Sequence, residues 1–486
     1  MGKGTGKAGS STQRSSQMKG LLCLKSPLKK LKIPFFYAPS LTLLQRYGLR
    51  FVLFKQTPFV NHEIGGLDLL FGSPWEYDRA LNYLKRDGFV VYLSEKNEPY
   101  KTMVVKYDKT NDFLLVLHLQ RKVAWCGLEA LSAKEVLAHA KTYKGYSGLL
   151  LPCYEDILLI HAGHILFENY TIQPYEHHIF NKLKKRKLDQ VYIQRQLEAY
   201  GWNTSFEKFM HLATQEHAVP FSLPVSLVAM NTLRKMLLCN PFIHFFLLAK
   251  QSIQYVTKRI SLKKRGLLIV FEGVNGSGKS TLTQAVFEKY QALEGKLTLP
   301  HHTYYFGWKP FFPLTKFISW VLSSLRKDQG IQGIYQEALE EETHQTVPRF
   351  SLKNELMFSY LFFDYLLRYY FHIYPWLRKR SLVVCDRSFY HLYGQYPYTP
   401  SSAVMKHLVK LFPRPDSLFL LDVDLKTLAK RRKTIPPQQL KNQLIRYRYL
   451  IRLVGALPLK NAKRIDTIVR RVVVHTWRKR FEHLQY

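Results

Sequence analysis

The sequence predicts an α/β protein that ends in a doubly wound parallel sheet, preceded by an α+β domain and a helical connector. A short, wholly apolar run at Leu267–Phe271 is followed by a glycine-rich stretch and then by an amphipathic segment, which is the order strand, loop and helix. Beyond this point, apolar runs of strand length alternate with helical patterns, as they do in parallel sheets. We therefore expect residues 265–486 to form one α/β domain.

Length and charge bound the rest of the chain. A chain of 486 residues is too long for one ordinary core, so two or three domains are expected. The formal net charge is +37, which attracts polyanions such as nucleotides, RNA, DNA or an anionic membrane face without choosing among them. The five cysteines include no Cys-x-x-Cys pair, which argues against a disulfide framework and a cysteine zinc site and fits a reducing cytosol.

The ends and the apolar stretches predict a cytoplasmic protein. Residues 1–32 contain no acidic residue and are rich in Gly, Ser and Lys, which is typical of a disordered basic tail. The first 20 residues lack the apolar region of a signal peptide. The best candidate for a membrane span, residues 226–249, is interrupted by Arg234, Lys235 and Pro241, so no span is expected.

The first half of the chain is predicted to hold two parts. In the α+β domain at residues 33–180, helices are expected at 40–47 and 76–87, and strands at 49–54, 66–71, 89–93, 102–107 and 113–119. Residues 149–166 show short apolar runs with polar breaks. In the helical connector at residues 181–264, helices are expected at 191–200, 204–218, 225–238 and 242–260.

In the last domain, Gly273-x4-Gly278-Lys279-Ser280 meets the full phosphate-loop pattern. Its glycines allow backbone conformations in which successive N–H groups point at phosphate, and the following helix offers its positive end. We expect Lys279 to reach the β and γ phosphates of ATP and Ser280 to help hold Mg²⁺. The predicted nucleotide-binding residues are Gly273, Val274, Asn275, Gly276, Ser277, Gly278, Lys279, Ser280 and Thr281.

Further along this domain, strands are expected at 298–305, 382–386 and 418–423, and helices at 354–371, 405–411 and 425–433. Asp386 and Arg387 close the second of these strands, where ligands bind in open α/β sheets. Asp386 can hold Mg²⁺ or take the proton of the acceptor, while Arg387 clamps a phosphate. The alternative is a helix-capping Asp beside a surface Arg.

A basic run at 430–433 ends a predicted helix. Arg431 or Arg432 could neutralise the charge that develops on a transferred phosphoryl group. The alternative is a helix end whose basic residues simply complement the helix dipole. Residues 464–467 carry a weaker signal for the adenine end of a nucleotide.

With these residues in place, the chain from about Leu267 to Phe481 resembles the thymidylate kinases. The segments VFEGVNGSGKST, LMFSYLFFD, VVCDRSFY, PRPDSLFLLDVDLKTLAKRR and RIDT occur in the family order. The resemblance implies transfer of the γ-phosphoryl group of ATP to a nucleoside monophosphate, with Mg²⁺ and a lid that carries arginines. Lys279, Asp386 and Arg387 match directly, and Arg431 and Arg432 fall in the lid region.

Two departures concern the acceptor. The family has an Asp in the loop that meets the sugar 3′-hydroxyl, and this chain has Asn275. The family has Asp-Arg on the following helix, whereas here Asp364 precedes Tyr365 and the nearest arginine is Arg368. The resemblance thus implies acceptor binding by Asn275, Asp364, Arg368 and Arg387, and it weakens the case for dTMP itself.

The strand and helix order of residues 33–180 resembles the uncharacterised bacterial branch of the nucleotidyltransferases. Lys55-Gln56 replaces the Gly pair of that family, Asp68 is the only carboxylate of its Asp-x-Asp, and His118 stands where a third acid is expected. Because one carboxylate holds a divalent cation pair poorly, we expect a degenerate domain with lost or weakened transfer activity. The histidines at 161, 164, 177 and 178 are interpreted as structural rather than metal ligands.

The leading hypothesis is a nucleoside-monophosphate kinase that uses ATP and Mg²⁺. An alternative is an ATP-binding switch or RNA-binding protein without kinase turnover, because the tail and C-terminus are strongly basic. A minor alternative is a nucleotidyltransferase that acts through the N-terminal domain. The oligomeric state stays open, with a homodimer among the choices.

Overall fold

The computed structural model describes the chain in several stretches. They are residues 35–55, 66–96, 98–125, 127–143, 148–169, 171–213, 266–297, 299–307, 352–397, 402–460 and 464–484, with residues 230, 241, 242, 245, 246, 249, 253 and 399. The predicted basic tail lies outside the described residues, as do, for the most part, the connector helices expected at 225–238 and 242–260.

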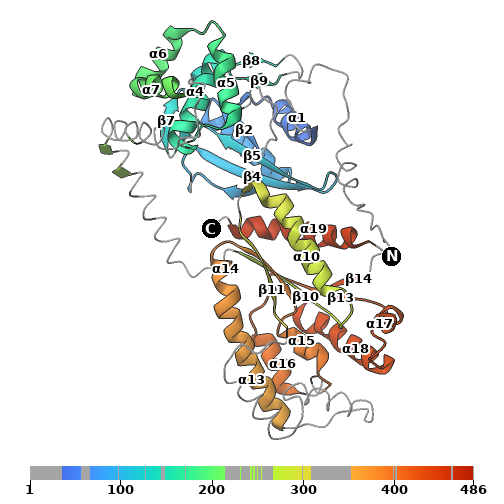
Figure 1. The fold of residues 1–486 in the computed structure, drawn as a ribbon. Helices are drawn as coiled ribbons and strands as arrows, with labels where there is room; N and C mark the ends of the chain where they lie inside the picture. Colours follow the sequence, from blue (N-terminus) through green and yellow to red (C-terminus); the bar gives the residue numbers. More distant parts are fainter. Residues whose placement is uncertain are drawn as a thin grey trace, which may run out of the picture. The chain divides into compact units, whose positions relative to one another are not determined.

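The chain forms two compact units with mixed α/β structure (Figure 1). The first comprises residues 1–89, 93–104 and 115–255, and the second residues 90–92, 105–114 and 256–486. The mixed α/β class expected from the sequence is therefore confirmed. None of the helices in the described part of the chain is long and apolar enough to cross a bilayer.

A mixed sheet of seven strands runs in the order β3-β4-β5-β2-β1-β9-β8. Its strands are β1 (Phe51–Leu53), β2 (Leu67–Phe71), β3 (Val90–Leu93), β4 (Lys101–Asp108), β5 (Phe113–Gln120), β8 (Lys141–Thr142) and β9 (Leu150–Leu151). β2 pairs with β5 in parallel and with β1 antiparallel. The strands predicted between residues 49 and 119 are confirmed, with ends shifted by one or two residues.

The helices of the first unit begin where local signals place them. In α2 (Pro74–Arg86), the Ser73 hydroxyl accepts a hydrogen bond from the Glu76 N–H at 3.2 Å, and Pro74 occupies the first turn. The other elements are η2 (Phe35–Tyr37), α1 (Ala38–Arg46), β6 (Val123–Trp125), β7 (Leu128–Leu131), α3 (Ala133–His139), α4 (Tyr154–His164), η3 (Ile165–Asn169), α5 (Pro174–Lys184), α6 (Gln190–Ala199) and α7 (Asn203–Ala213). The stretch with short apolar runs at 149–166 thus forms β9, α4 and the start of a π-helical turn, η3.

The core of the first unit extends past the boundary predicted at residue 180. Trp202, before α7, is buried against Phe167 and Phe206, and its indole N–H donates to the Ala130 carbonyl at 3.0 Å. Phe180 and Phe209 pack edge to face in the same cluster. Residues 181–213 therefore pack as part of this core and leave no break at residue 180.

The second unit is built on a five-stranded, all-parallel sheet in the order β11-β12-β10-β13-β14. Its strands are β10 (Leu267–Glu272), β11 (His301–Tyr305), β12 (Leu382–Asp386), β13 (Ser417–Asp422) and β14 (Leu457–Lys460). β10 and β12 are buried along their whole length, as their apolar sequences predict. The strands expected at 267–271, 298–305, 382–386 and 418–423 are confirmed.

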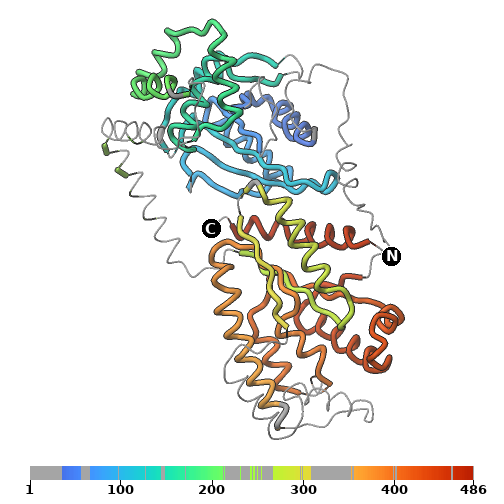
Figure 2. Tube along the Cα trace, in the orientation of Figure 1, coloured from blue at the N-terminus to red at the C-terminus, as the bar shows by residue number. Residues whose placement is uncertain are grey.

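Helices cover both faces of this sheet (Figures 1 and 2). One face carries α10 (Lys279–Glu294) and α19 (Ile465–Leu484). The other face carries α13 (Leu352–Arg368), η5 (Tyr369–Ile373), α14 (Tyr374–Arg378), α15 (Tyr390–Gln395), α16 (Ala403–Leu411) and α18 (Pro437–Val454). Two short elements complete the unit: α17 (Leu425–Arg431) follows β13, and η4 (Gly295–Leu297) follows α10. The helix expected at 354–371 is α13, which continues into the π-helical turn η5.

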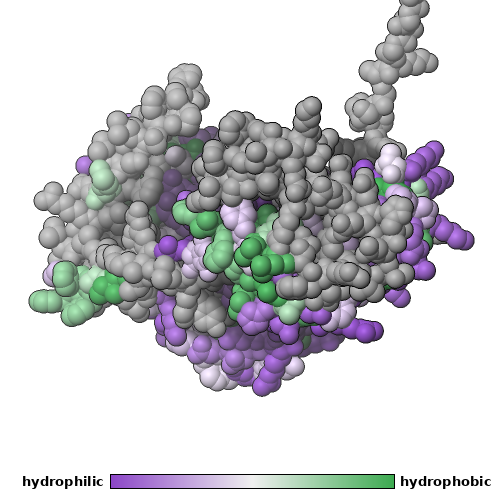
Figure 3. All heavy atoms as spheres, turned by 90° about the horizontal axis from the view of Figure 1, so that it is seen from below, coloured by the Kyte–Doolittle hydropathy of each residue, from purple (hydrophilic) through white to green (hydrophobic). Residues whose placement is uncertain are grey.

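Apolar side chains also reach the surface of the second unit. Leu352, Leu356 and Phe363 lie along one side of α13, because they are spaced by four and seven residues, and each is more than half exposed. Figure 3 shows apolar residues gathered beside hydrophilic ones on the face seen from below. The three side chains of α13 form an exposed apolar strip within the described part of the chain.

A buried ion pair joins the two helices on the first face. Arg480 of α19 is fully buried, and its Nε and Nη2 lie 3.1 and 3.0 Å from the Glu294 carboxylate of α10. Nη1 donates to the Arg380 carbonyl at 2.7 Å, so each charged group is hydrogen bonded. One turn away, the Tyr290 and Thr476 hydroxyls are 2.6 Å apart. The pair thus fixes α19 against α10.

Replacing Arg480 by Met should destabilise the protein by about 3–5 kcal/mol, because the buried Glu294 would lose its arginine partner and keep only the hydrogen bond with His301. Arg478→Met is the matched control on the same helix, because its exposed pair with Glu482 should cost at most about 0.5 kcal/mol. Urea unfolding of the two variants measures the difference. Equal losses in both variants would show that the buried pair has no special role.

Candidate functional site

The loop between β10 and α10 takes a conformation that only glycine adopts easily. Gly273, Gly276 and Gly278 have φ angles of 147°, 89° and 95°. A side chain at Gly276 would also lie 3.0 Å from Arg432 Cγ. We call residues 273–280 the phosphate loop. The loop leads into the first turn of α10, a helix of 16 residues that begins at the carboxyl edge of the sheet, and such a turn can bind an anion.

Lys279 lies inside the phosphate loop. It is only 4% exposed, and its ammonium donates to the carbonyls of Gly273 and Val274 at 2.9 and 3.0 Å. Burial, together with the charge of Arg387, lowers the pKa of Lys279. An anion with several charges at this position would offset both effects.

Ser280 and Asp386 meet at the carboxyl edge of the sheet. The parallel pairing of β10 and β12 places Asp386 opposite Phe271, and the Ser280 hydroxyl donates to Asp386 Oδ2 at 2.5 Å. The other carboxylate oxygen, Oδ1, is buried and has no hydrogen-bond partner among the described residues. A hydroxyl and a carboxylate with an open acceptor are the oxygen ligands that Mg²⁺ takes, so the two residues fit this ion.

Three arginines surround the phosphate loop. Arg387 has a φ angle of 73°, and its guanidinium donates to Asn275 Oδ1 at 3.0 Å and to the Tyr305 hydroxyl at 2.5 Å. Arg431, the last residue of α17, donates to the Gly276 carbonyl at 3.1 Å. Arg432 packs against the same glycine. The structure therefore brings Arg387, Arg431 and Arg432 to one loop from two different parts of the chain.

The residues expected to bind an acceptor divide into two groups. Asn275 and Arg387 are bonded to each other beside the loop. Arg368 is buried instead, where it donates to the Gly307 carbonyl at 2.9 Å and lies over the rings of Phe306 and Tyr365. Asp364 is buried on the same helix. In this arrangement Arg368 fixes the chain after β11.

Sequence reasoning missed Glu272, the last residue of β10. It is 1% exposed, and its Oε1 accepts a hydrogen bond from the Ser388 hydroxyl at 2.7 Å. Burial raises the pKa of Glu272 to about 8, despite the hydrogen bond from Ser388 and the charge of Lys279, which lower it. The only signal in the sequence is a single acid that ends an apolar strand. Tyr305 was missed as well, because nothing in its surroundings in the sequence connects it to Arg387.

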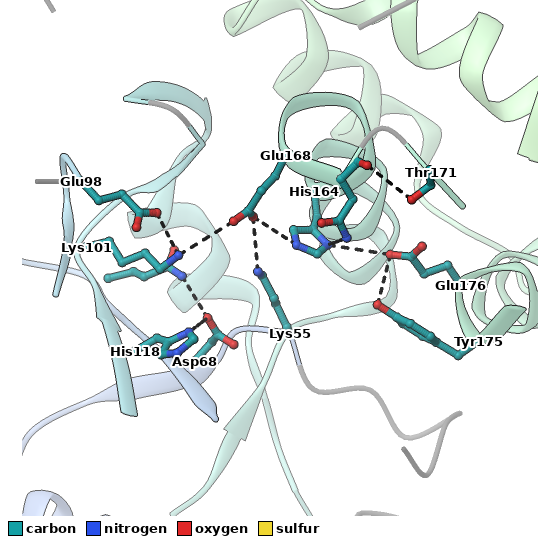
Figure 4. A network of polar contacts seen from close by, with 12 residues as sticks. Lys55, Asp68, Glu98, Lys101, His118, His164, Glu168, Thr171, Tyr175 and Glu176 are labelled. Atoms are coloured by element: carbon teal, nitrogen blue, oxygen red, sulfur yellow. Dashed lines mark hydrogen bonds and ion pairs between the residues drawn. The ribbon is translucent and has the colours of Figure 1, made fainter. Parts of the chain in front are cut away.

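A second cluster of polar residues lies in the first unit (Figure 4). Asp68 of β2 accepts hydrogen bonds from Gln120 and pairs with His118 of β5, both at 3.1 Å. Burial alone would raise the pKa of Asp68, but the charges of Lys55 and His118 bring it below its usual range. The structure thus brings together Lys55, Asp68 and His118.

Glu168 extends this cluster. Its carboxylate lies 3.1 Å from His164 Nε2, 3.7 Å from Lys55 Nζ and 4.0 Å from Lys101 Nζ. Burial would raise its pKa, but the His164 hydrogen bond and the Lys55 charge lower it to about 2. No group of three metal-ligating side chains occurs among the residues that the structure describes. Lysines therefore neutralise the carboxylates here, and the lost transfer activity stays a prediction.

Comparison with models of protein families and with curated proteins finds no match. Among solved structures, the chain is similar to a thymidylate kinase from Ehrlichia chaffeensis, with 18% sequence identity and a TM-score of 0.28. The match covers 43% of this chain and 98% of that one. A likeness of this size leaves the function to be argued from the site itself.

The buried acid Glu272 predicts a pH-dependent stability. The pKa of Glu272 in the folded protein lies above that of a Glu in an unfolded chain. The contribution of Glu272 to the free energy of unfolding is therefore complete below about pH 4.3 and is lost as the pH rises towards 8. The Glu272→Gln variant has no ionisable group at this position. Its free energy of unfolding, relative to that of the wild type, should therefore increase from pH 5 to pH 8 by roughly 2 kcal/mol or more and then level off. Thermal unfolding across this range measures the difference. A constant difference would mean that Glu272 ionises normally.

Proposed function

We propose that the second unit transfers the γ-phosphoryl group of ATP to a small acceptor, a nucleoside monophosphate such as dTMP or a related compound. The observation that carries the proposal is the meeting of four groups at one loop: the Lys279 ammonium, the Ser280–Asp386 pair, Arg387 and Arg431. They come from three separate segments of the chain. Phosphoryl transfer needs this combination of cations and oxygen ligands around a phosphate.

The donor half of the site follows from the phosphate loop. Its amides and the first turn of α10 bind the β and γ phosphates, and Lys279 neutralises their charge. Mg²⁺ would be held by Ser280 and Asp386, and it would neutralise further phosphate charge. The lowered pKa of Lys279 is consistent with this role, since the triphosphate restores the charged form.

The transferred group lies between the loop and the arginines. Charge spreads over the phosphoryl oxygens in the transition state, and guanidinium groups stabilise it by bidentate hydrogen bonds. Arg387 and Arg431 now bond to Asn275, Tyr305 and Gly276, so the substrates replace protein acceptors that are already in place. Arg432 adds a further charge beside Gly276.

The acceptor half differs from what the thymidylate kinase resemblance implies. Asn275 lacks the negative charge of the family's Asp, and Arg368 is committed to the Gly307 carbonyl. An acceptor phosphate would therefore bind chiefly to Arg387, with the exposed ring of Tyr305 beside it. These residues suit a nucleotide with a planar base and leave its identity to experiment.

A second candidate is an ATP-binding protein that grips RNA. One observation favours it, because Asp466 and Glu482 are the only acids after residue 424, in a segment rich in Arg and Lys. Gel shifts at physiological salt distinguish the two readings. Tight, salt-sensitive RNA binding without formation of ADP would favour the second candidate.

Replacing Lys279 by Ala should lower kcat for phosphoryl transfer by about 10³-fold, because one charge is removed from the site where phosphoryl charge develops. Purified full-length protein is mixed with ATP, Mg²⁺ and a panel of nucleoside monophosphates, and ADP is measured. Lys410→Ala, on the exposed side of α16, is the control and should keep wild-type turnover. Turnover retained in Lys279→Ala would contradict the mechanism.

A further inference from the structure

Buried polar contacts lead away from the phosphate loop through Glu272. The Glu272 carboxylate holds the Ser388 hydroxyl through Oε1, and Ser388 directly follows Arg387. The second oxygen, Oε2, has no hydrogen-bond partner among the described residues and lies 3.6 Å from His391 Nδ1. Glu272 therefore faces both the turn that carries Arg387 and the helix α15.

The same nitrogen of His391 contacts α18. The Tyr447 hydroxyl lies 2.6 Å from His391 Nδ1, and the Gln395 amide donates to the Tyr447 oxygen at 3.3 Å. The hydrogen bond between Tyr447 and His391 ties α15 to α18, whichever of the two atoms donates. Burial lowers the pKa of His391 well below its usual value, so the ring stays neutral.

Glu272 contacts the same nitrogen of His391 without a hydrogen bond, because Oε2 and Nδ1 are 3.6 Å apart. Burial raises the pKa of Glu272, so its carboxyl can face the neutral ring. Hydrogen bonds join Gln395, Tyr447 and His391, and the contact at Nδ1 connects them to Glu272.

The contact between α15 and α18 is close along its length. A side chain at Gly394 would lie 2.3 Å from the Tyr447 ring. Arg446 is buried and donates to the carbonyls of Gly394 and Gln395 at 3.1 and 3.2 Å, at the end of α15. Residues 432–436 connect α18 to α17, which ends with Arg431. A shift of α18 would therefore break buried hydrogen bonds and move the arginines.

We propose that Glu272, His391 and Tyr447 are positioning residues that hold Arg431 and Arg432 over the phosphate loop. The proposal rests on the proposed function, and it adds a link between the end of β10 and the arginines at the end of α17. None of the three residues need touch the substrates. Each acts through the next, and the last, Tyr447, fixes the helix that follows the arginines.

Tyr447→Phe tests the link, because it removes one hydroxyl and keeps the ring against Gly394. We expect kcat for ADP formation to fall about 10-fold, while the Kd for ATP measured by calorimetry stays unchanged, since the loop and Lys279 are intact. Tyr449→Phe is the matched control: Tyr449 lies on the same helix, is 42% exposed and stacks on Tyr393. Wild-type kcat in Tyr447→Phe would overturn the proposal.

Variants of Glu272 separate positioning from folding. Glu272→Gln keeps a neutral group of the same size that can accept the Ser388 hydrogen bond and contact His391, and it should retain kcat. Glu272→Ala should lose kcat as Tyr447→Phe does. A purely structural role predicts lower thermal stability in both Glu272→Ala and Tyr447→Phe with kcat unchanged, which would count against the proposal.

A readout without turnover keeps this test separate from the proposed function. Trypsin cleaves after the exposed Arg431 and Arg432, and we expect faster cleavage in Tyr447→Phe than in the wild type and Tyr449→Phe. Equal cleavage rates overturn the positioning role. A wild-type protein that forms no ADP, but shows this difference in cleavage, contradicts the kinase assignment alone.

Discussion

The pairing of β10 with β12 is the constraint on which the rest of the site depends. The two strands are parallel and in a register that places Phe271 opposite Asp386. Because parallel strands end at the same edge of a sheet, the residues after Phe271 and the carboxylate of Asp386 meet there. The loop from β10 to α10 brings the Ser280 hydroxyl to that carboxylate, and three glycines with positive φ angles allow the loop to turn. The sheet therefore places the chemistry, and the helices around it hold the sheet.

Burial of charge accompanies this arrangement. Glu272, Lys279 and Asp386 are all buried at the sheet edge, and their charges and those of Arg387 interact. A buried charge is tolerated when it is paired or neutralised, and here burial raises the pKa of the Glu272 carboxyl while Lys279 bonds to backbone carbonyls. Such groups respond strongly to an incoming phosphate, because little water screens them. The same logic applies in the first unit, where Lys55 and Lys101 lie beside Glu168, and where the charges of Lys55 and His118 lower the pKa of the buried Asp68.

Local patterns in the sequence were enough to predict the strands and the phosphate loop. The apolar runs of β10 and β12, the loop glycines and the pair Asp386-Arg387 lie within short segments, so their spacing carries the information. Contacts between distant segments carry no such signal. Nothing near Glu272 in the sequence points to Ser388, and His391 and Tyr447 lie on different helices. Arg368 illustrates the same limit, because its position on α13 was predicted but the ring of Phe306 beside it becomes a neighbour only in the fold. The packing of α5, α6 and α7 into the first core escaped sequence reasoning for the same reason.

Calorimetric titration of the full-length protein with ATP, with and without Mg²⁺, tests the central claim most directly. Binding at one site is expected in both conditions, and tighter when Mg²⁺ is present, because Ser280 and the open oxygen of Asp386 then take part. Asp386→Asn should remove the gain from Mg²⁺ and leave the metal-free affinity nearly unchanged. Absence of ATP binding in the wild type, or an equal gain from Mg²⁺ in Asp386→Asn, would contradict the account.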